Sequence, residues 1–96
     1  MTAQPKPLEE RRRRALYRAV HRGTKEMDWL LGRYAEGRLA AMDEAEMDEF
    51  EQFIALPDPS LQVWLMSGVG FEGSAFTALI GRIRAFHGLE SKAGAA

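Results

Sequence analysis

The sequence predicts an all-α protein, a small single-domain bundle of five helices. Apolar side chains recur at spacings of three and four residues along most of the 96-residue chain. Glycine or proline interrupts this pattern at short intervals, and no segment alternates polar and apolar residues for long enough to form a strand. Short helices joined by tight loops bury their apolar faces against one another, which is the packing of a helical bundle.

The first two helices are separated by Gly23. A disordered lead-in is expected over residues 1–7, which contain two prolines, and a first helix over 8–20. Thr24 is a suitable N-cap for the second helix, and Gly37 is expected to close it.

The third helix has the clearest start. Asp43 and Glu46 stand at the two positions of a capping box, and Met42 and Met47 are placed to form a hydrophobic staple across it. Pro57 ends this helix, because proline cannot donate the next backbone hydrogen bond.

The last two helices follow at once. Asp58 is expected as the N-cap of the fourth helix, with Pro59 at its first helical position and Gly68 near its end. Ser74 is a suitable cap for the fifth helix, which Gly88 ends.

Size and composition agree with one globular domain, expected over residues 8–90 and followed by a frayed tail over 91–96. The chain has no cysteine, which excludes disulfides, thiolate metal sites and thiol nucleophiles and fits a cytoplasmic location. No apolar run approaches the roughly 20 residues that span a bilayer, so no membrane insertion is expected. The formal net charge is −1, so no overall field attracts nucleic acid.

Charge is nevertheless divided unevenly along the chain. Residues 1–22 hold seven cations against two acids, a net charge of +5, and residues 36–58 hold eight acids against one arginine, a net charge of −7. Both segments are expected to form solvated helix faces. The arginines at 11–14 show no aromatic interleaving and no nucleic-acid-binding motif, so we expect them at most to steer a protein partner.

Few residues could perform catalysis. His21 and His87 are far apart in sequence, and neither has metal-ligand spacing to another histidine. Phosphate-binding loops, dinucleotide fingerprints, nucleophile elbows and zinc-protease motifs do not occur in the sequence. The acids of residues 43–51 lie on a predicted helix without the desolvated cleft that general acid–base catalysis needs. We therefore expect that the chain is not an enzyme.

One constellation stands out, the segment Arg22-Gly23-Thr24-Lys25-Glu26-Met27-Asp28. Its glycine would let a partner's backbone approach closely, and one arginine and two acids lie around it. From the residues alone, the segment is either a partner-binding surface or a capped helix start around an ordinary glycine turn, and the second interpretation is favoured.

The same segment matches R-G-x-x-E-x-D, the signature of the flavinylation and assembly factors of succinate dehydrogenase, bacterial SdhE and its mitochondrial counterpart. The chain resembles this family beyond the signature. An acidic segment with two phenylalanines, Asp43–Phe53, and the block Leu56-Pro57-Asp58-Pro59-Ser60-Leu61-Gln62-Val63-Trp64-Leu65-Met66 follow at the family's spacing. The resemblance extends over about residues 11–88.

The resemblance implies a five-helix assembly factor that binds the flavoprotein subunit of succinate dehydrogenase, or of fumarate reductase, and promotes covalent attachment of FAD to it. The FAD would belong to that subunit, so no stably bound cofactor is expected in this chain, which would be a monomer when free. The partner-binding residues that the resemblance implies are Arg22, Gly23, Glu26, Asp28 and Trp64.

Two alternatives remain open at this point. Trp64 is spaced with Leu61 and Leu65, which is also the pattern of a core residue. The alternative function is a generic helical protein–protein adaptor, or a nucleic-acid binder that uses the basic N-terminal arm.

Overall fold

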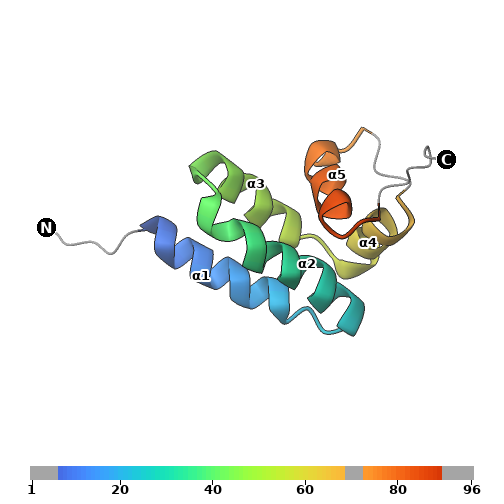
Figure 1. The fold of residues 1–96 in the computed structure, drawn as a ribbon, viewed down its shortest axis with the longest axis horizontal. Coiled ribbons are helices and arrows are strands. Elements are labelled where there is room, and N and C mark those ends of the chain that lie inside the picture. Colours follow the sequence, from blue (N-terminus) through green and yellow to red (C-terminus); the bar gives the residue numbers. More distant parts are fainter. Residues whose placement is uncertain (1–6, 69–72, 90–96) are drawn as a thin grey trace, which may run out of the picture.

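The computed structural model of this chain describes residues 7–68 and 73–89. Within these ranges the chain forms five α-helices and two short helical turns, and no strand (Figure 1). A 3₁₀ turn continues the second helix, and a π-helical turn continues the fourth. The elements in chain order are α1 (Pro7–Val20), α2 (Lys25–Arg38), the 3₁₀ turn (Leu39–Ala41), α3 (Glu44–Ile54), α4 (Asp58–Gln62), the π turn (Val63–Ser67) and α5 (Thr77–Phe86). The predicted all-α, five-helix architecture is confirmed.

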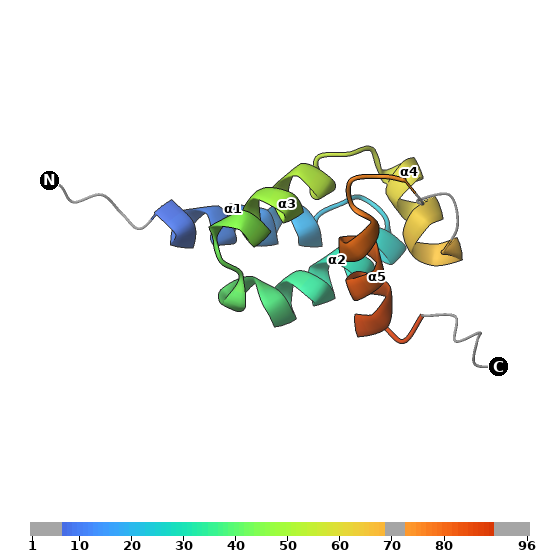
Figure 2. The same cartoon turned by 90° about the horizontal axis from the view of Figure 1, so that it is seen from above.

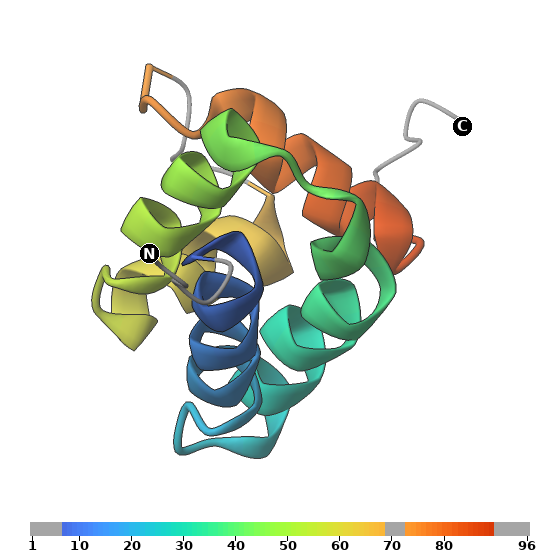
Figure 3. The same cartoon turned by 90° about the vertical axis from the view of Figure 1, so that its left-hand side faces the viewer.

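The helices are arranged as an antiparallel pair with a third helix beside it and a smaller group at one end. α1 and α2 form the antiparallel pair, and α3 returns alongside α1 (Figure 2). α5 packs against α2 and against the π turn, which keeps α4, the π turn and α5 together. The loop between α1 and α2 lies at the same end of the molecule as α4 (Figures 1 and 2). Seen along the long axis, the helices enclose a common interior (Figure 3).

The core in this interior is apolar, and every helix contributes to it. Its large, fully buried side chains are Met27, Leu30, Leu31, Met47, Phe50, Phe53, Leu61, Leu65, Leu79, Ile80 and Ile83. α1 contributes the small side chains of Ala15 and Ala19, which let it approach its neighbours closely. A Cβ added to Gly32 of α2 would lie 2.9 Å from Cγ1 of Val20, so α1 and α2 are in tight contact at that point.

The basic segment 1–22 and the acidic segment 36–58 were both expected to be solvated, but some of their charged side chains pair with each other. Nη2 of Arg11 donates to Asp48 Oδ1 at 2.6 Å and to Glu51 Oε1 at 2.9 Å, which ties α1 to α3. The hydrogen bonds to Glu51 and Asp48 raise the pKa of Arg11 above its ordinary value. Nη2 of Arg12 donates to the carbonyl of Met42 at 2.6 Å, just before α3 begins.

The strongest boundary signals in the sequence are confirmed. Asp43 Oδ1 accepts from the Glu46 amide and Glu46 Oε1 accepts from the Asp43 amide, each at 2.9 Å, so the capping box is complete. Gly68 and Gly88 follow the π turn and α5 with φ of +74° and +72°, the left-handed conformation that glycine adopts at helix ends.

Two expected helix limits shift. α1 begins at Pro7, one residue before the range predicted for the bundle. The expected disordered lead-in, apart from Pro7, and the expected frayed tail over 91–96 lie outside the described residues. Gly37 does not close α2, which continues to Arg38 and then into the 3₁₀ turn. A helical glycine costs only about 1 kcal/mol relative to alanine, so burial of the residues beyond it can carry the helix through.

Two predicted caps are wrong. Asp58 is the first residue of α4 and Pro57 is its N-cap, because the Asp58 carboxylate is held by the side chain of Arg22. The Ser74 hydroxyl accepts from the Phe76 amide at 3.0 Å, which forms a turn before α5 rather than its cap.

We predict that Asp43→Ala lowers the free energy of unfolding by about 0.5–2 kcal/mol, because the Glu46 amide at the start of α3 loses its partner, Asp43 Oδ1. Chemical denaturation measures this difference. Glu44→Ala is the matched control, since it removes a carboxylate from the same helical turn without removing a cap, and its loss should stay near 0.3–1 kcal/mol. Equal losses for both variants would show that the capping box adds nothing to the stability.

Candidate functional site

Gly23 lies in the loop between α1 and α2, in a backbone conformation that other residues rarely adopt. Its φ is +113°, far from the values open to residues with a Cβ. A Cβ built on it meets no atom within 4 Å. The glycine is therefore required by the backbone conformation rather than by crowding within the chain, and the space in front of it is open.

Arg22, its neighbour, points inward. The side chain is only 10% exposed. Its Nε and Nη2 donate to Asp58 Oδ1 at 2.9 and 2.6 Å, Nη1 donates to the Ile54 carbonyl at 2.6 Å, and Nη2 also donates to the Leu56 carbonyl at 3.2 Å. The last carbonyls of a helix have no partner within it, so this guanidinium satisfies the end of α3 while it pairs with the start of α4. We call this set of contacts the Arg22 clamp.

Asp28 also serves the loop from within the chain. Its Oδ1 accepts from the Arg22 amide at 2.5 Å and from the Gly23 amide at 3.3 Å. Thr24 is the N-cap of α2, as predicted, and its hydroxyl accepts from the Met27 amide at 3.2 Å. The loop is thus held on one side by the Arg22 clamp and on the other by the first turn of α2.

Glu26 differs from the other charged residues of the signature. It lies in the first turn of α2, is exposed, and makes no side-chain hydrogen bond or ion pair among the described residues. The positive end of the helix dipole stabilises its carboxylate. Glu26 and Gly23 together form the open part of the signature, which we call the Gly23–Glu26 surface.

Trp64 lies in the π turn, half-buried and packed against the core. Its neighbours Val63 and Met66 are exposed, at 53% and 44%. These two residues and Pro59 line a shallow apolar hollow on the surface of α4 and the π turn. Val63 and Met66 were not among the residues predicted from the sequence to bind a partner. The sequence did contain a clue to their exposure. Val63 and Met66 do not share the helical face of the buried Leu61 and Leu65.

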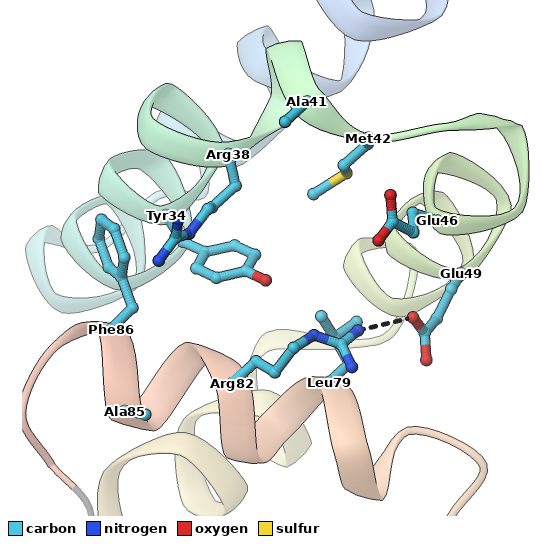
Figure 4. A pocket seen from close by; sticks show the side chains of 10 residues that line it. All are labelled: Tyr34, Arg38, Ala41, Met42, Glu46, Glu49, Leu79, Arg82, Ala85 and Phe86. Atoms are coloured by element: carbon cyan, nitrogen blue, oxygen red, sulfur yellow. Dashed lines mark hydrogen bonds and ion pairs between the residues drawn. The ribbon is translucent and has the colours of Figure 1, made fainter.

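A second hollow of about 450 Å³ lies between α2, α3 and α5 (Figure 4). On one wall, Arg82 donates to Glu49 Oε1 at 3.0 Å, and on the other, the Arg38 guanidinium lies 5.3 Å from the centroid of the Phe86 ring. Burial lowers the pKa of Arg82, but hydrogen bonding to Tyr34 and the charge of Glu49 outweigh burial and raise it overall. The cations are balanced by acids here, so the hollow does not select for an anion.

The remaining sequence candidates do not assemble into a metal site or a catalytic group. His21 lies in the α1–α2 loop, and His87, at the end of α5, donates through Nε2 to the Leu30 carbonyl at 2.8 Å. Among residues 7–68 and 73–89, no group of three or more histidine, aspartate or glutamate side chains is arranged to hold a metal ion. None of the helices in these ranges is both long enough and apolar enough to span a membrane.

We predict that a double-mutant cycle on Arg22→Met and Asp58→Asn gives a coupling of about 1.5–3 kcal/mol in unfolding free energy, the range of a hydrogen bond between charged groups. Arg82→Met and Glu49→Gln are the matched control, because that pair is more exposed, and its coupling should be about 0.2–1 kcal/mol. If both cycles give the same small coupling, Arg22 does not clamp the loop.

The sequence matches the protein family described as "Flavinator of succinate dehydrogenase" over residues 13–87. The "FAD assembly factor SdhE" of Acetobacter pasteurianus is 36% identical over 76 residues, which are 79% of this chain and 70% of that protein. The protein of the same name from Xylella fastidiosa is 41% identical over 64 residues, 67% of this chain and 66% of that one.

A mitochondrial relative is similar over a smaller part of its length. "Succinate dehydrogenase assembly factor 2, mitochondrial" of Scheffersomyces stipitis is 37% identical over 57 residues, 59% of this chain and 38% of that protein. No solved structure shows a significant match. The family match includes the signature loop, the Arg22 clamp and α2 to α5, and the chain belongs to the family of succinate dehydrogenase flavinators.

Proposed function

We propose that this chain is an assembly factor that binds the flavoprotein subunit of succinate dehydrogenase and promotes covalent attachment of FAD to that subunit. Family membership and the names of the bacterial relatives support this function. The observation that carries it is the geometry of the signature. Arg22 and Asp28 hold the loop from inside, and Gly23 and Glu26 are left open to a partner.

The four signature residues then have two different roles. Gly23 and Glu26 contact the flavoprotein subunit, the glycine by close backbone approach and the glutamate through its carboxylate. Arg22 and Asp28 are positioning residues, because the Arg22 guanidinium and Asp28 Oδ1 are engaged in hydrogen bonds within the chain. Trp64 is only half-buried, so its exposed part could contribute to the same partner together with Val63 and Met66.

FAD is a group that the partner holds, and the loop residues here do not fit it. A flavin pyrophosphate is commonly bound by free backbone amides at a helix start. In this chain the amides of Arg22 and Gly23, just before α2, are directed at the Asp28 carboxylate, and the first turn of α2 carries the carboxylates of Glu26 and Asp28, which would repel a phosphate. With the FAD held by the partner subunit, we propose that the reacting groups belong to that subunit as well and that this chain is not itself the enzyme.

Binding alone can promote the flavin linkage if it selects one conformation of the subunit. A ligand shifts such an equilibrium only by its difference in affinity for the two conformations, about 1.4 kcal/mol for each tenfold change in population. A loop held rigidly from two sides suits this role, because little conformational entropy is lost when it docks.

Three finer points belong to the same proposal. The flavoprotein subunit of fumarate reductase is a second partner of the same kind. The free chain is a monomer, and it acts in the cytoplasm. The absence of cysteine, which fits a reducing compartment, supports the last point.

We predict that Glu26→Ala loses most of the covalent flavin on the partner subunit, because removing one member of a desolvated interfacial charge pair costs about 2–5 kcal/mol. In-gel flavin fluorescence of the denatured subunit, from cells lacking the native factor, measures this loss. Glu44→Ala is the control, since it also removes an exposed acid from the first turn of a helix, α3, and full flavinylation is expected. Equal flavinylation by both variants would reject the Gly23–Glu26 surface.

We predict that Gly23→Arg also abolishes flavinylation, because a large side chain would hold the two backbones apart. Gly23→Ala separates this effect from backbone strain, since both variants force a Cβ into the same conformation. The unfolding free energies of the two variants should be similar, while Gly23→Ala should retain more covalent flavin. Equal flavin loss at equal stability would assign the effect to strain alone.

A further inference from the structure

The side of α1 that faces away from the core carries cationic and aromatic side chains. We call it the α1 outer face. Its residues, all exposed, are Arg13, Arg14, Tyr17 and Arg18 of the helix and His21 directly after it. Tyr17 is 64% exposed, the highest value among the exposed large apolar residues of the described ranges. The arginine run at 11–14 contains no aromatic residue, but Tyr17 lies between Arg14 and Arg18 on this face.

The cations of the α1 outer face are not neutralised by other residues of the described ranges. Arg14 approaches Glu10 only at 3.6 Å in an exposed pair, which adds little stability. Arg13 and Arg18 make no side-chain hydrogen bond or ion pair within residues 7–68 and 73–89. The inward arginines of the same region, Arg11 and Arg22, are both paired with carboxylates. In this region some arginines stabilise the fold, while Arg13, Arg14 and Arg18 remain available to bind a partner.

The aromatic part of this face is held in place next to the signature. The rings of Tyr17 and His21 stack with centroids 4.1 Å apart, and His21 Nδ1 donates to the Tyr17 carbonyl at 2.9 Å. Beside them lies a hollow of about 440 Å³, which Arg18 and Leu56 also line. His21 immediately precedes Arg22 and Gly23, so the α1 outer face is continuous with the Gly23–Glu26 surface.

We infer that the α1 outer face extends the docking surface and receives an acidic segment of the flavoprotein subunit. This inference rests on the proposed function. Arginine and tyrosine are among the residue types most enriched at the few interface positions that contribute most of the binding energy. The cations supply attraction and orientation, while Tyr17 supplies a large contact area whose side chain is already ordered.

Nucleic acid fits this face less well than an acidic protein segment does. One side of the Tyr17 ring is covered by His21, which leaves no row of open rings on which successive bases could stack. Glu10 and Glu26 lie at the two ends of the surface and would repel phosphates. The chain as a whole carries a net charge of −1.

The test measures binding of the purified chain to the purified flavoprotein subunit by isothermal titration calorimetry at low and moderate salt. Arg18→Glu should raise the dissociation constant about tenfold or more, and Tyr17→Ala should weaken binding as well. The matched control is Arg38→Glu, which reverses another exposed arginine in the last turn of a helix, α2, on a different face. It should change the dissociation constant by less than about threefold, and circular dichroism verifies that each variant is folded.

Each outcome separates this inference from the proposed function. Unmeasurable binding of the unmodified chain would reject the proposed function itself. Binding that Arg18→Glu and Tyr17→Ala leave unchanged would reject the α1 outer face and keep the proposed function. In parallel, a fluorescein-labelled 20-nucleotide single strand is titrated with the chain. Tight binding that falls steeply with salt and is lost in Arg18→Glu would overturn the inference in favour of nucleic acid.

Discussion

The exposure of Gly23 and Glu26 to a partner depends on the Arg22 clamp. One guanidinium reaches from the α1–α2 loop to the Ile54 carbonyl at the end of α3, to the Leu56 carbonyl in the link that follows, and to the Asp58 carboxylate at the start of α4. Its removal would leave a carboxylate and two carbonyls without partners in a part of the molecule with little access to water. Together with the Asp28 contacts, the clamp fixes the backbone at Gly23 and the direction in which α2 starts.

Arginine has the same supporting role elsewhere in the bundle. Arg11 joins α1 to α3 through two carboxylates, and Arg84 of α5 donates to the Leu65 carbonyl at 2.6 Å, which holds the π turn against α5. A planar guanidinium with several donors can satisfy helix ends and carboxylates at once, which lysine cannot. Charged contacts at the edge of the small core thereby stabilise the packing of the helices. The exposed residues of α1 and α2 remain free for a partner.

The sequence predicted the helices well because their signals are local. Asp43 with Glu46, and Thr24 with Met27, contact residues three positions away, so spacing alone was enough. The Arg22 clamp could not be predicted in this way, because Asp58 lies 36 positions from Arg22 in the sequence. From the sequence, Asp58 was equally suited to be the N-cap of the fourth helix. The resemblance identified the signature residues, but it could not divide them into open and inward-facing ones.

The most direct test of this account is hydrogen–deuterium exchange of the chain, free and bound to the purified flavoprotein subunit. The amides of Lys25 and Glu26 have no partner within the start of α2, so they should exchange rapidly in the free chain. Binding should slow exchange over residues 22–26 and leave exchange at the start of α3, at Glu44, unchanged. Unaltered exchange over residues 22–26, with protection around Glu44 instead, would contradict the claim that the clamped loop is the docking surface.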